Sequence, residues 1–492
     1  MPSSSNGWAR ASGRSLPPSE RARLRLTLRR ARLSASGKPS SLKEPRHVPD
    51  RSDTAPLRIA PLRIAIAGLG TVGAGVIRLL ATNRDLIAAR AGRPIAVTAV
   101  SARDRAKDRD VDIAPFAWED DMTALASRED VDVVVELVGG ADGPALALSR
   151  AALKGGKGLV TANKAMIAHH GLALAEAAEG AGVALKFEAA VAGGIPVVKG
   201  LREGTSANAL TKVYGILNGT CNYILSEMEE TGADFDETLT EAQRLGYAEA
   251  DPSFDIDGVD AAHKLAILSA IGFGARVDFD SVRLTGIRQV RAADIAQADA
   301  LGFVIRLIGE ADVEEGENGP CLLQRVRPCL VHKDHPLAPV DGPTNAVVAE
   351  GNFSGRLLFQ GAGAGDGPTA SAVVADLIDI ARSEVSAPFS IPVARLAALP
   401  PAEPGHRTER AYIRFTVNDR PGVLAEITAA MRDADVSIES LIQHGRSREG
   451  GEVLVAMVTH EGPERCVTKA LELLEGSDSL TGEPLVLPIL GD

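Results

Sequence analysis

LRIAIAGLGTVGAGVIRLL, residues 62–80, joins a short aliphatic run to a helical apolar pattern through three glycines. The aliphatic run predicts a buried strand, and the apolar pattern after the glycines predicts a helix. Gly68 permits a tight turn, Gly70 lets the backbone approach a pyrophosphate, and Gly73 lets helix and strand pack closely. Phosphates bind at the N-terminus of such a helix. The motif is weak alone, but strand and helix flank it correctly, so it predicts a nucleotide-binding domain.

Two further aliphatic strands, PIAVTAV (94–100) and VDVVVELVGG (131–140), extend this pattern into a parallel, doubly wound sheet. In such sheets ligands collect at the carboxyl ends of the strands. TANK (161–164) follows one strand in this way. Lys164 is therefore either a ligand contact or a solvated turn lysine.

The second strand bears on the choice of cofactor. Where an NAD enzyme usually has an acid for the ribose hydroxyls, this chain has Ser101, Arg103, Arg105 and Lys107. These residues favour a 2′-phosphate and hence NADP. Asp104 in the same turn leaves NAD, with a merely solvated basic turn, as the alternative.

The stretch AQRLGYAEADPSFDIDGVDAAHK (242–264) places many ionisable groups beside an apolar run. From Gly258 to Ala275 the only ionisable residues are Asp260, His263 and Lys264, so the run predicts a helix buried on most sides. Asp260 and Lys264 are four residues apart and share one helical face. A buried lysine is unfavourable unless it is paired or used in chemistry.

Two simpler interpretations of this stretch are an ordinary surface ion pair and a calcium loop. The apolar surroundings argue against the first, because exposed pairs sit in polar surroundings. The spacing argues against the second, because Pro252 and Phe254 stand where an EF-hand loop needs oxygen ligands.

Composition indicates an ordinary globular protein of two to four domains: 492 residues, 45% hydrophobic and 24% charged. No apolar run reaches the roughly 18 residues of a membrane helix. Four cysteines without CxxC spacing suit a reducing compartment, and we expect a cytoplasmic protein.

Charge is uneven along the chain. Residues 1–50 carry eleven Lys/Arg and three Asp/Glu, a net charge of +8, which leaves −20 for the rest of a chain whose total is −12. The acidic charge of residues 51–492 argues against a nucleic-acid partner. Together with the absence of an apolar run of membrane length, this charge leads us to expect no membrane partner. The head fits a disordered basic extension over 1–60, a transit peptide, a nucleic-acid tail, or a start codon placed too far upstream.

Several segments in order resemble homoserine dehydrogenase, over roughly 62–490. They are GLGTVGAGV, TANK, EAAVAGGIP (188–196), GILNGTCNYIL (215–225) and the stretch 242–264. The last agrees with the family signature at Ala242, Gly246, Asp251, Pro252, Asp255, Gly258, Asp260 and Lys264. The resemblance implies interconversion of L-homoserine and L-aspartate 4-semialdehyde with NAD(P)(H), in threonine, methionine and isoleucine biosynthesis.

The family's functional positions carry over onto this chain. Lys264 or Lys164 would be the proton donor, with Asp260 beside them, and the chemistry agrees because a developing alkoxide needs an acid. The resemblance places the substrate at Glu249 and Asp255, while backbone amides of 215–220 could take its carboxylate. The expected cofactor contacts are Gly68, Gly70, Thr71, Val72, Gly73, Arg103, Gly139, Thr161, Lys164 and Gly365. A monovalent cation such as Na⁺ would be bound by Glu188 and by the carbonyls of Val191, Gly193 and Ile195.

The C-terminal segment AYIRFTVNDRPGVLAEITAAMRDADVSIESLIQHGRSREGGEVLVAMVTHE (411–461) begins a strand-helix-strand-strand-helix-strand pattern that resembles an ACT domain. Asp419 is a natural N-cap and Pro421 suits the first helical turn. The resemblance implies a homodimer or homotetramer and feedback by L-threonine. The expected effector contacts are Asn418, Asp419, Gly422, Ile442 and Gln443. A module used only for dimerisation is the alternative.

The expected architecture is therefore α/β with three domains: a Rossmann-type doubly wound nucleotide domain, an α+β substrate and dimerisation domain, and a βαββαβ ACT domain. The expected boundaries are 61–190 with 360–385, 191–360, a linker over 386–409, and 410–492. Three rival functions stay open at this point, and the first is another amino-acid oxidoreductase of similar architecture. An aspartate-semialdehyde dehydrogenase would need a nucleophilic cysteine such as Cys221 with a histidine partner. An amino-acid sensor would retain an inactive nucleotide fold.

Overall fold

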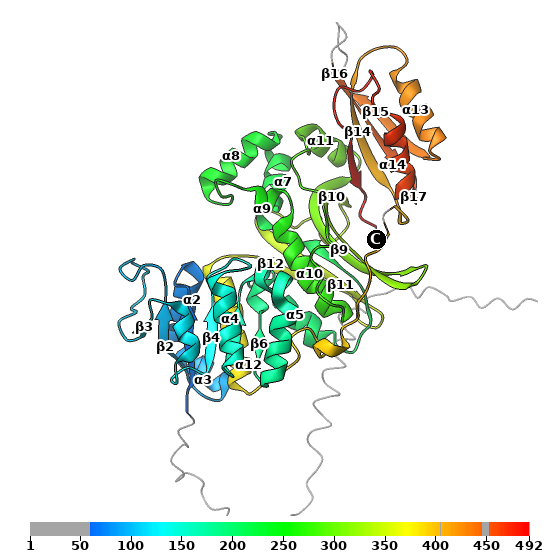
Figure 1. Cartoon of the computed structure of the whole chain (residues 1–492). Coiled ribbons are helices and arrows are strands. Elements are labelled where there is room, and N and C mark those ends of the chain that lie inside the picture. Colours follow the sequence, from blue (N-terminus) through cyan, green and yellow to red (C-terminus); the bar gives the residue numbers. More distant parts are fainter. Residues whose placement is uncertain (1–59, 404, 445–451, 492) are drawn as a thin grey trace, which may run out of the picture. The chain divides into compact units, whose positions relative to one another are not determined.

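The computed structural model describes residues 60–403, 405–444 and 452–491, and Figure 1 traces their helices and strands. The basic extension expected over 1–60 lies outside this part of the chain except for its last residue. All described elements belong to one contact unit, 59–492.

The first sheet is parallel throughout, with six strands in the order β3-β2-β1-β4-β5-β6. This is a doubly wound sheet, as residues 62–80 predicted together with the strands of 94–100 and 131–140, and the strand order reverses direction at β1. The strands are β1 (Leu62–Ala67), β2 (Ile95–Ser101), β3 (Ala117–Trp118), β4 (Val133–Glu136), β5 (Gly158–Thr161) and β6 (Leu185–Lys186). The main helices are α2 (Thr71–Thr82), α3 (Arg84–Ala91), α4 (Pro144–Lys154), α5 (Lys164–Ala181) and α12 (Asp366–Ala381).

Both faces of this sheet are buried, because after Arg63 the strand β1 presents apolar side chains to both of them. Ile64 and Ile66 pack with α2 and α12, whereas Ala65 and Ala67 belong to the core shared with α4 and α5. The helix α12 follows the second sheet in the chain and packs with α2 on one face of the first sheet.

The strand β4 is shorter than the sequence predicted, ending at Glu136 rather than near Gly140. The carboxylate of Glu136 explains this end. Its Oε1 accepts the backbone N–H groups of Val138 (2.7 Å) and Gly139 (3.1 Å), which turns the chain away from the sheet.

The second sheet has the order β12-β11-β7-β9-β10-β8 and is antiparallel except where β8 meets β10. Its strands are β7 (Leu210–Ile216), β8 (Arg283–Leu284), β9 (Phe303–Gly316), β10 (Gly319–His332), β11 (Thr344–Gly351) and β12 (Gly355–Ala362). The accompanying helices are α6 (Val197–Lys199), α7 (Gly219–Thr231), α8 (Phe235–Leu245), α9 (Ser253–Ile256), α10 (Val259–Phe273) and α11 (Ala292–Ala300).

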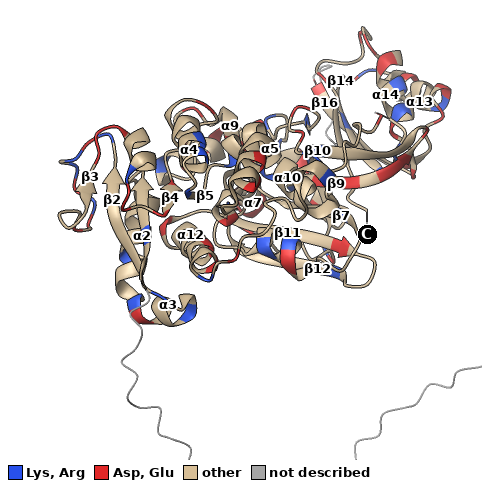
Figure 2. Cartoon of the chain, turned by 60° about the horizontal axis from the view of Figure 1, so that its bottom comes forward, with Lys and Arg blue, Asp and Glu red and all other residues tan. Residues whose placement is uncertain are grey.

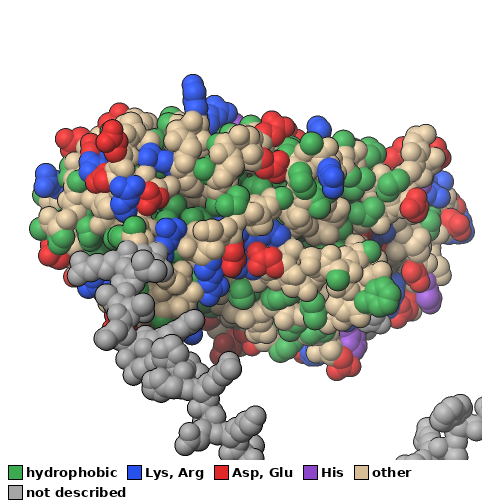
Figure 3. Space-filling model, turned by 90° about the horizontal axis from the view of Figure 1, so that it is seen from below, with side chains coloured by type: hydrophobic (Ala, Val, Ile, Leu, Met, Phe, Trp, Pro, Cys, Tyr) green, Lys and Arg blue, Asp and Glu red, His purple; other side chains and the backbone are tan. Residues whose placement is uncertain are grey.

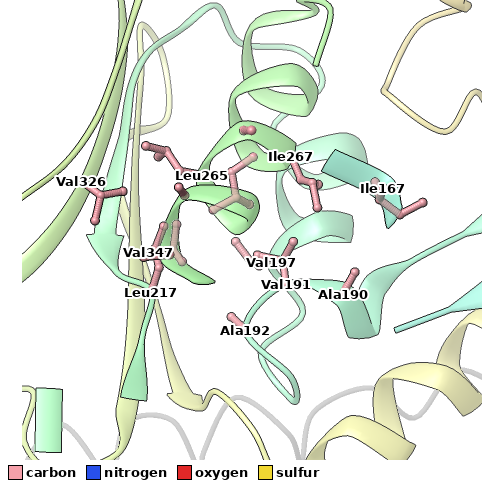
Figure 4. Packing of buried hydrophobic residues seen from close by; sticks show 14 of the residues in the cluster. Ile167, Ala190, Val191, Ala192, Val197, Leu217, Leu265, Ile267, Val326 and Val347 are labelled. Carbon is pink, nitrogen blue, oxygen red and sulfur yellow. The ribbon is translucent and has the colours of Figure 1, made fainter. Parts of the chain in front are cut away.

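The helix α10 joins the two domains. Every residue from Asp260 to Ile271 is buried, as predicted, and Gly258 and Gly274 take left-handed conformations at its two ends. Figure 4 shows Leu265 directed toward Val326 of the second sheet and Ile267 directed toward Ile167 of α5. The helix therefore packs against apolar side chains on both sides. Its few polar residues must find polar partners within the protein.

The third sheet has the order β15-β16-β14-β18 and the βαββαβ connectivity of an ACT domain. It contains β14 (Ala411–Asn418), α13 (Val423–Asp433), β15 (Ile438–His444), β16 (Glu452–Thr459), α14 (Glu464–Leu473) and β18 (Leu485–Pro488). One local prediction was wrong. The helix α13 begins at Val423 with Gly422 as N-cap, so Asp419 and Pro421 precede it. Gly422 turns the chain into the helix with a left-handed backbone, φ +99°.

This third domain packs against the second sheet through ionic and apolar contacts. Buried Asp294 of α11 accepts a hydrogen bond from the Tyr412 hydroxyl (2.9 Å) and pairs with Arg414 (2.8 Å). Glu409 of β13 (Thr408–Glu409) pairs with Arg325 (2.9 Å) of β10. The segment 386–409, expected as a linker, is itself hydrogen-bonded to the second domain, for example from Leu322 N–H to the Pro400 carbonyl (2.8 Å).

Charges of both signs are interspersed on the surface, as Figure 2 shows along α3 and α14. The face in Figure 3 likewise mixes basic, acidic and hydrophobic side chains. Among the described residues, every helix is too short or too polar to cross a lipid bilayer.

Candidate functional site

A cavity of about 1070 Å³ lies between the carboxyl edge of the parallel sheet and the second domain. Its wall includes Val72 of α2, Lys164 of α5, and Asp260 and Lys264 of α10. This is the place where ligands of doubly wound sheets bind. The cavity therefore brings together parts of the chain that are up to about 300 residues apart in sequence.

The glycine turn has the geometry that a phosphate requires. A Cβ added to Gly68, which has φ +95°, would lie 2.4 Å from the Leu137 carbonyl oxygen, and one added to Gly73 would lie 2.1 Å from the Gly68 oxygen. Apart from atoms of the adjoining chain, no atom of the described residues lies within 4 Å of a Cβ added to Gly70. Gly68 and Gly73 are thus required by the fold itself, while the space at Gly70 lies open at the start of α2.

The other expected cofactor residues are distributed around this edge. Gly365 lines the cavity, whereas Arg103 lies exposed in the loop after β2. The Thr161 hydroxyl is buried and donates to Glu136 Oε2 (2.6 Å), whose other oxygen accepts the N–H of Gly139. Thr161 and Gly139 therefore shape the ends of β4 and β5 and do not line the cavity.

Two lysines share one buried carboxylate at the cavity. Lys264 Nζ lies 2.7 Å from Asp260 Oδ2, and Lys164 Nζ lies 2.7 Å from Asp260 Oδ1. Lys264 also donates to the Leu217 carbonyl oxygen (2.7 Å). The side chain of Lys264 is 9% exposed and that of Lys164 is 33% exposed. The i,i+4 pair predicted from the sequence is present, and Lys164 joins it from the other domain.

Burial and neighbouring charge set the protonation of this group. Burial lowers the pKa of Lys264, the positive charge of Lys164 lowers it further, and Asp260 opposes both. For Asp260, burial works against the charged form, but Lys264 and Lys164 outweigh it and hold its pKa below the ordinary value. The buried carboxylate of Asp260 thus forms ion pairs with both Lys164 and Lys264. Of the two lysines, Lys264 has a lowered pKa and therefore gives up its proton more readily than an ordinary lysine.

The two acidic residues that were expected to bind the substrate, Asp255 and Glu249, lie in different surroundings. Asp255 lines the cavity, accepts Asn218 Nδ2 (2.7 Å) and the Thr220 hydroxyl (3.2 Å), and has its pKa raised, mainly by burial. Glu249 is exposed and does not line the cavity, although Gly246 and Tyr247 of the same turn do. The assignment of Glu249 to the substrate stays a prediction.

The sequence reasoning did not single out Asn218. This residue is 2% exposed and is the N-cap of α7, where its Oδ1 accepts the Cys221 N–H (2.8 Å). A strand followed by Asn-Gly-Thr is an N-cap signal that could have identified it. What no local pattern shows is that its amide reaches carboxylates 37 and 42 residues away.

The four positions expected to bind a cation lie in one loop region beside α6. Both oxygens of Glu188 accept backbone N–H groups, from Val198 (3.0 Å) and Lys199 (2.9 Å). Burial and the nearby Asp376 raise the pKa of Glu188 to about 7. A carboxylate with carbonyl oxygens is a donor set that fits a monovalent cation, and positive charge would favour ionised Glu188. The described residues contain no cluster of three or more His, Cys, Asp or Glu side chains arranged for a metal ion.

A second, smaller cavity of about 220 Å³ lies in the ACT domain. Four of the five expected effector positions line it: Asn418, Asp419, Gly422 and Gln443. Ile442 does not, because side chains alternate along β15 and only its neighbour Gln443 contributes.

Comparison with known proteins agrees with this geometry. Residues 68–188 match the family described as homoserine dehydrogenase, NAD binding domain, residues 196–378 match homoserine dehydrogenase, and residues 411–475 match the ACT domain. A homoserine dehydrogenase from Synechocystis sp. is 43% identical over 433 residues, which cover 86% of this chain and 98% of that protein.

Solved structures give the same result. The crystal structure of a homoserine dehydrogenase from Thiobacillus denitrificans has a TM-score of 0.81 at 41% identity, covering 88% of this chain and 98% of that one. A hyperthermophilic archaeal homoserine dehydrogenase in complex with NADPH has a TM-score of 0.56 at 25% identity, covering 65% of this chain and 97% of that one. With a Rossmann-type sheet, a lysine-bearing cavity and an ACT domain in one chain, the protein belongs to the homoserine dehydrogenase family of NAD(P)-dependent oxidoreductases.

Proposed function

We propose that the cavity interconverts L-homoserine and L-aspartate 4-semialdehyde, with Lys264 as the group that transfers the proton. The observation that carries this proposal is the carboxylate of Asp260 bearing two ammonium groups at the cavity wall. Turnover of homoserine by the purified chain, and its decrease when either lysine is replaced, test the proposal. An aspartate-semialdehyde dehydrogenase is not favoured, because burial raises the pKa of the Cys221 thiol far above its ordinary value.

The reaction divides between cofactor and protein. A bound nicotinamide supplies or accepts the hydride. In the reducing direction Lys264 donates a proton to the aldehyde oxygen as negative charge develops there, and in the oxidising direction its neutral amine accepts the hydroxyl proton. Two of the three N–H groups of Lys264 are directed to Leu217 and Asp260, so one remains for the substrate oxygen. Lys164 supplies a second positive charge and holds the other oxygen of Asp260.

Substrate binding would use both signs of charge in the cavity. Asp255 faces the substrate ammonium, with Glu249 as the second carboxylate. The helix α7 begins at Gly219, and Gly219 and Thr220 line the cavity. Free backbone amides at a helix N-terminus favour an anion, so this end of α7 would take the substrate carboxylate.

We assign the cofactor to the glycine turn and favour NADP over NAD. The exposed Arg103 loop after β2 supplies positive charge for a 2′-phosphate, and the loop is attached to the turn by Arg109 Nε, which donates to the Leu69 carbonyl (3.0 Å). The archaeal relative noted above was solved with NADPH.

Substitution of the two glycines by alanine should separate cofactor binding from folding. Gly70→Ala should leave the melting temperature unchanged or slightly raised, because its Cβ meets no atom, yet raise the KM for NADP by about tenfold through a clash with the pyrophosphate. Gly73→Ala should lower the unfolding free energy by about 1–3 kcal/mol, because its Cβ would press on backbone. Thermal unfolding without cofactor and initial rates with it are the measurements. Equal KM values for Gly70→Ala and wild type would contradict the placement of the phosphates.

Regulation by L-threonine is proposed for the cavity in the ACT domain. Removal of the whole domain is an unsuitable test, because it would expose the apolar face shared with Tyr412 and Leu487 and leave Asp294 without two partners. A point variant in the cavity avoids that damage.

Gln443→Ala should raise the threonine concentration needed for half-inhibition by about tenfold, the effect of losing one or two hydrogen bonds to a ligand. Gln289→Ala is the matched control, since that amide contacts Glu483 on the surface (3.2 Å). The measurement is the threonine concentration for half-inhibition, determined from inhibition curves of both variants. If the two respond alike, the effector lies elsewhere or the ACT domain serves only dimerisation.

The remaining assignments follow from the same architecture. We propose a homodimer or homotetramer, because β15 is an edge strand and ACT sheets commonly pair at their edges. We also propose a cytoplasmic enzyme of threonine, methionine and isoleucine biosynthesis, and a monovalent cation at Glu188, Val191, Gly193 and Ile195.

A further inference from the structure

Asn218 occupies a central position among the charged groups of the cavity. Its Oδ1 accepts the Cys221 N–H, which fixes the orientation of the side-chain amide. The two N–H groups of Nδ2 therefore face outward from α7, and they meet Asp255 Oδ1 at 2.7 Å and Asp260 Oδ2 at 2.8 Å. One neutral amide thus joins the carboxylate that faces the substrate to the carboxylate that bears the lysines.

Without the hydrogen bonds from Asn218, electrostatic repulsion would drive the carboxylates of Asp255 and Asp260 apart. Asp260 is buried and Asp255 is partly buried, and like charges repel more strongly in such surroundings than in water. The charge of Asp260 raises the pKa of Asp255, whereas the hydrogen bond from Asn218 lowers it. Lys164 and Lys264 pull Asp260 toward themselves, but no lysine among the described residues forms an ion pair with Asp255. Within the part of the chain that the structure describes, the amide of Asn218 is the one neutral group that donates hydrogen bonds to both carboxylates.

We propose that Asn218 is a positioning residue, which sets the distance between Asp255 and Asp260 and so fixes the substrate ammonium relative to the proton-donating lysine. This inference rests on the roles proposed above for Asp255 and Lys264. It assigns to the Asn218 side chain a function in catalysis beyond capping α7.

Two substitutions separate capping from positioning. Asn218→Asp and Asn218→Ser both keep a side-chain oxygen that can cap α7. The aspartate loses both donated hydrogen bonds and adds a third carboxylate, and the serine retains at most one donor on a shorter side chain. We expect kcat/KM for homoserine to fall by about 10²-fold for Asn218→Asp and by about tenfold for Asn218→Ser, with kcat and KM both affected.

The pH profile gives a readout that loss of a cap would not change. Additional negative charge and a lost hydrogen bond both make Asp255 harder to ionise. The acid limb of kcat/KM should therefore move to higher pH in the order wild type, Asn218→Ser, Asn218→Asp. If Asn218→Asp does not fold, Asn218→Ser against wild type still tests the shift.

Asn222 on the same helix provides the matched control. It is buried, and its Nδ2 donates to backbone carbonyls and not to carboxylates: those of Val340 and Gly342 at 2.9 Å and that of Thr344 at 3.4 Å. Asn222→Ser and Asn222→Asp should lower stability but leave the acid limb in place. An unshifted limb in the Asn218 variants, with lysine variants inactive, would overturn the positioning role alone. Active lysine variants would instead overturn the proposed function beneath it.

Discussion

Replacing Lys264 by methionine should lower kcat for homoserine oxidation by about 10²-fold to 10⁴-fold, the usual contribution of a positioned proton-transfer group. Methionine fills a similar space but has no ionisable group that could donate or accept a proton. Asp260 keeps Lys164 and Asn218 as partners in this variant, so it retains a charged neighbour. Initial rates in both directions, with the fold checked by circular dichroism, give the measurement.

Lys164→Met should also reduce kcat, and its pH profile distinguishes the two lysines. In oxidation Lys264 must be neutral to accept a proton, so the rate should rise with pH through its pKa, which lies below the ordinary 10.5. In reduction Lys264 must be charged, and the rate should fall over the same range. The positive charge of Lys164 lowers the pKa of Lys264. Lys164→Met should therefore move the pH-dependent limb that Lys264 sets to higher pH. Lys264→Met should abolish the limb.

Lys186→Met is the matched control for both variants. Lys186 of β6 is also buried, its pKa is also lowered mainly by burial, and it donates to the Ser386 hydroxyl (3.1 Å) away from the cavity. Its removal should leave the pH limb unmoved. Parental rates in both Lys264→Met and Lys164→Met would refute the catalytic assignment.

Local sequence patterns predicted the elements that depend on near neighbours. The strand, glycine turn and helix of 62–80 were predicted because their periodicity and turn chemistry are both contained in one short segment. The apolar run from Gly258 to Ala275 gave α10 to within two residues at each end. The i,i+4 pair of Asp260 and Lys264 follows directly from helical geometry.

Contacts between distant segments were beyond such patterns. Lys164 meets Asp260 across 96 residues, and Asn218 meets it across 42, so only the packing of α5, α7 and α10 brings them together. Resemblance to the family supplied Lys164 but not Asn218. The start of α13 was misplaced because Asp419 and Gly422 are both plausible N-caps, and the left-handed backbone at Gly422 decides between them. The end of β4 depended on the Glu136 side chain, which competes with the sheet for the next amides.

Asp260→Asn should be the most destabilising change at the cavity, because it leaves the buried ammonium of Lys264 without its anion. Removal of one partner from a buried ion pair costs about 3–5 kcal/mol of unfolding free energy. The variant should also be less active in reduction, since loss of the Asp260 charge lowers the pKa of Lys264 further and so decreases the fraction of Lys264 that carries a proton to donate. Chemical denaturation and initial rates measure the two effects.

The pH dependence of this destabilisation has a definite sign. Because the folded-state pKa of Asp260 is held below its ordinary value, its stabilising contribution is present above about pH 4 and is lost as pH falls through the folded pKa. The difference in unfolding free energy between wild type and Asp260→Asn should therefore be full at neutral pH and shrink in acid. A constant difference across that range would indicate that Asp260 is not an ionised partner of the lysines.

The double variant Asp260→Asn with Lys264→Met separates stability from catalysis. With both buried charges absent, no ammonium is left without a counter-ion in the interior, and Lys164 can extend its partly exposed side chain toward solvent. Most of the lost unfolding free energy should return, because replacing both partners of a buried pair by neutral groups is often nearly neutral. Activity should not return, since no group remains at position 264 to exchange a proton with the substrate oxygen. A double variant as unstable as Asp260→Asn alone would mean that the destabilisation comes from the packing of α10 and not from the charge of Lys264.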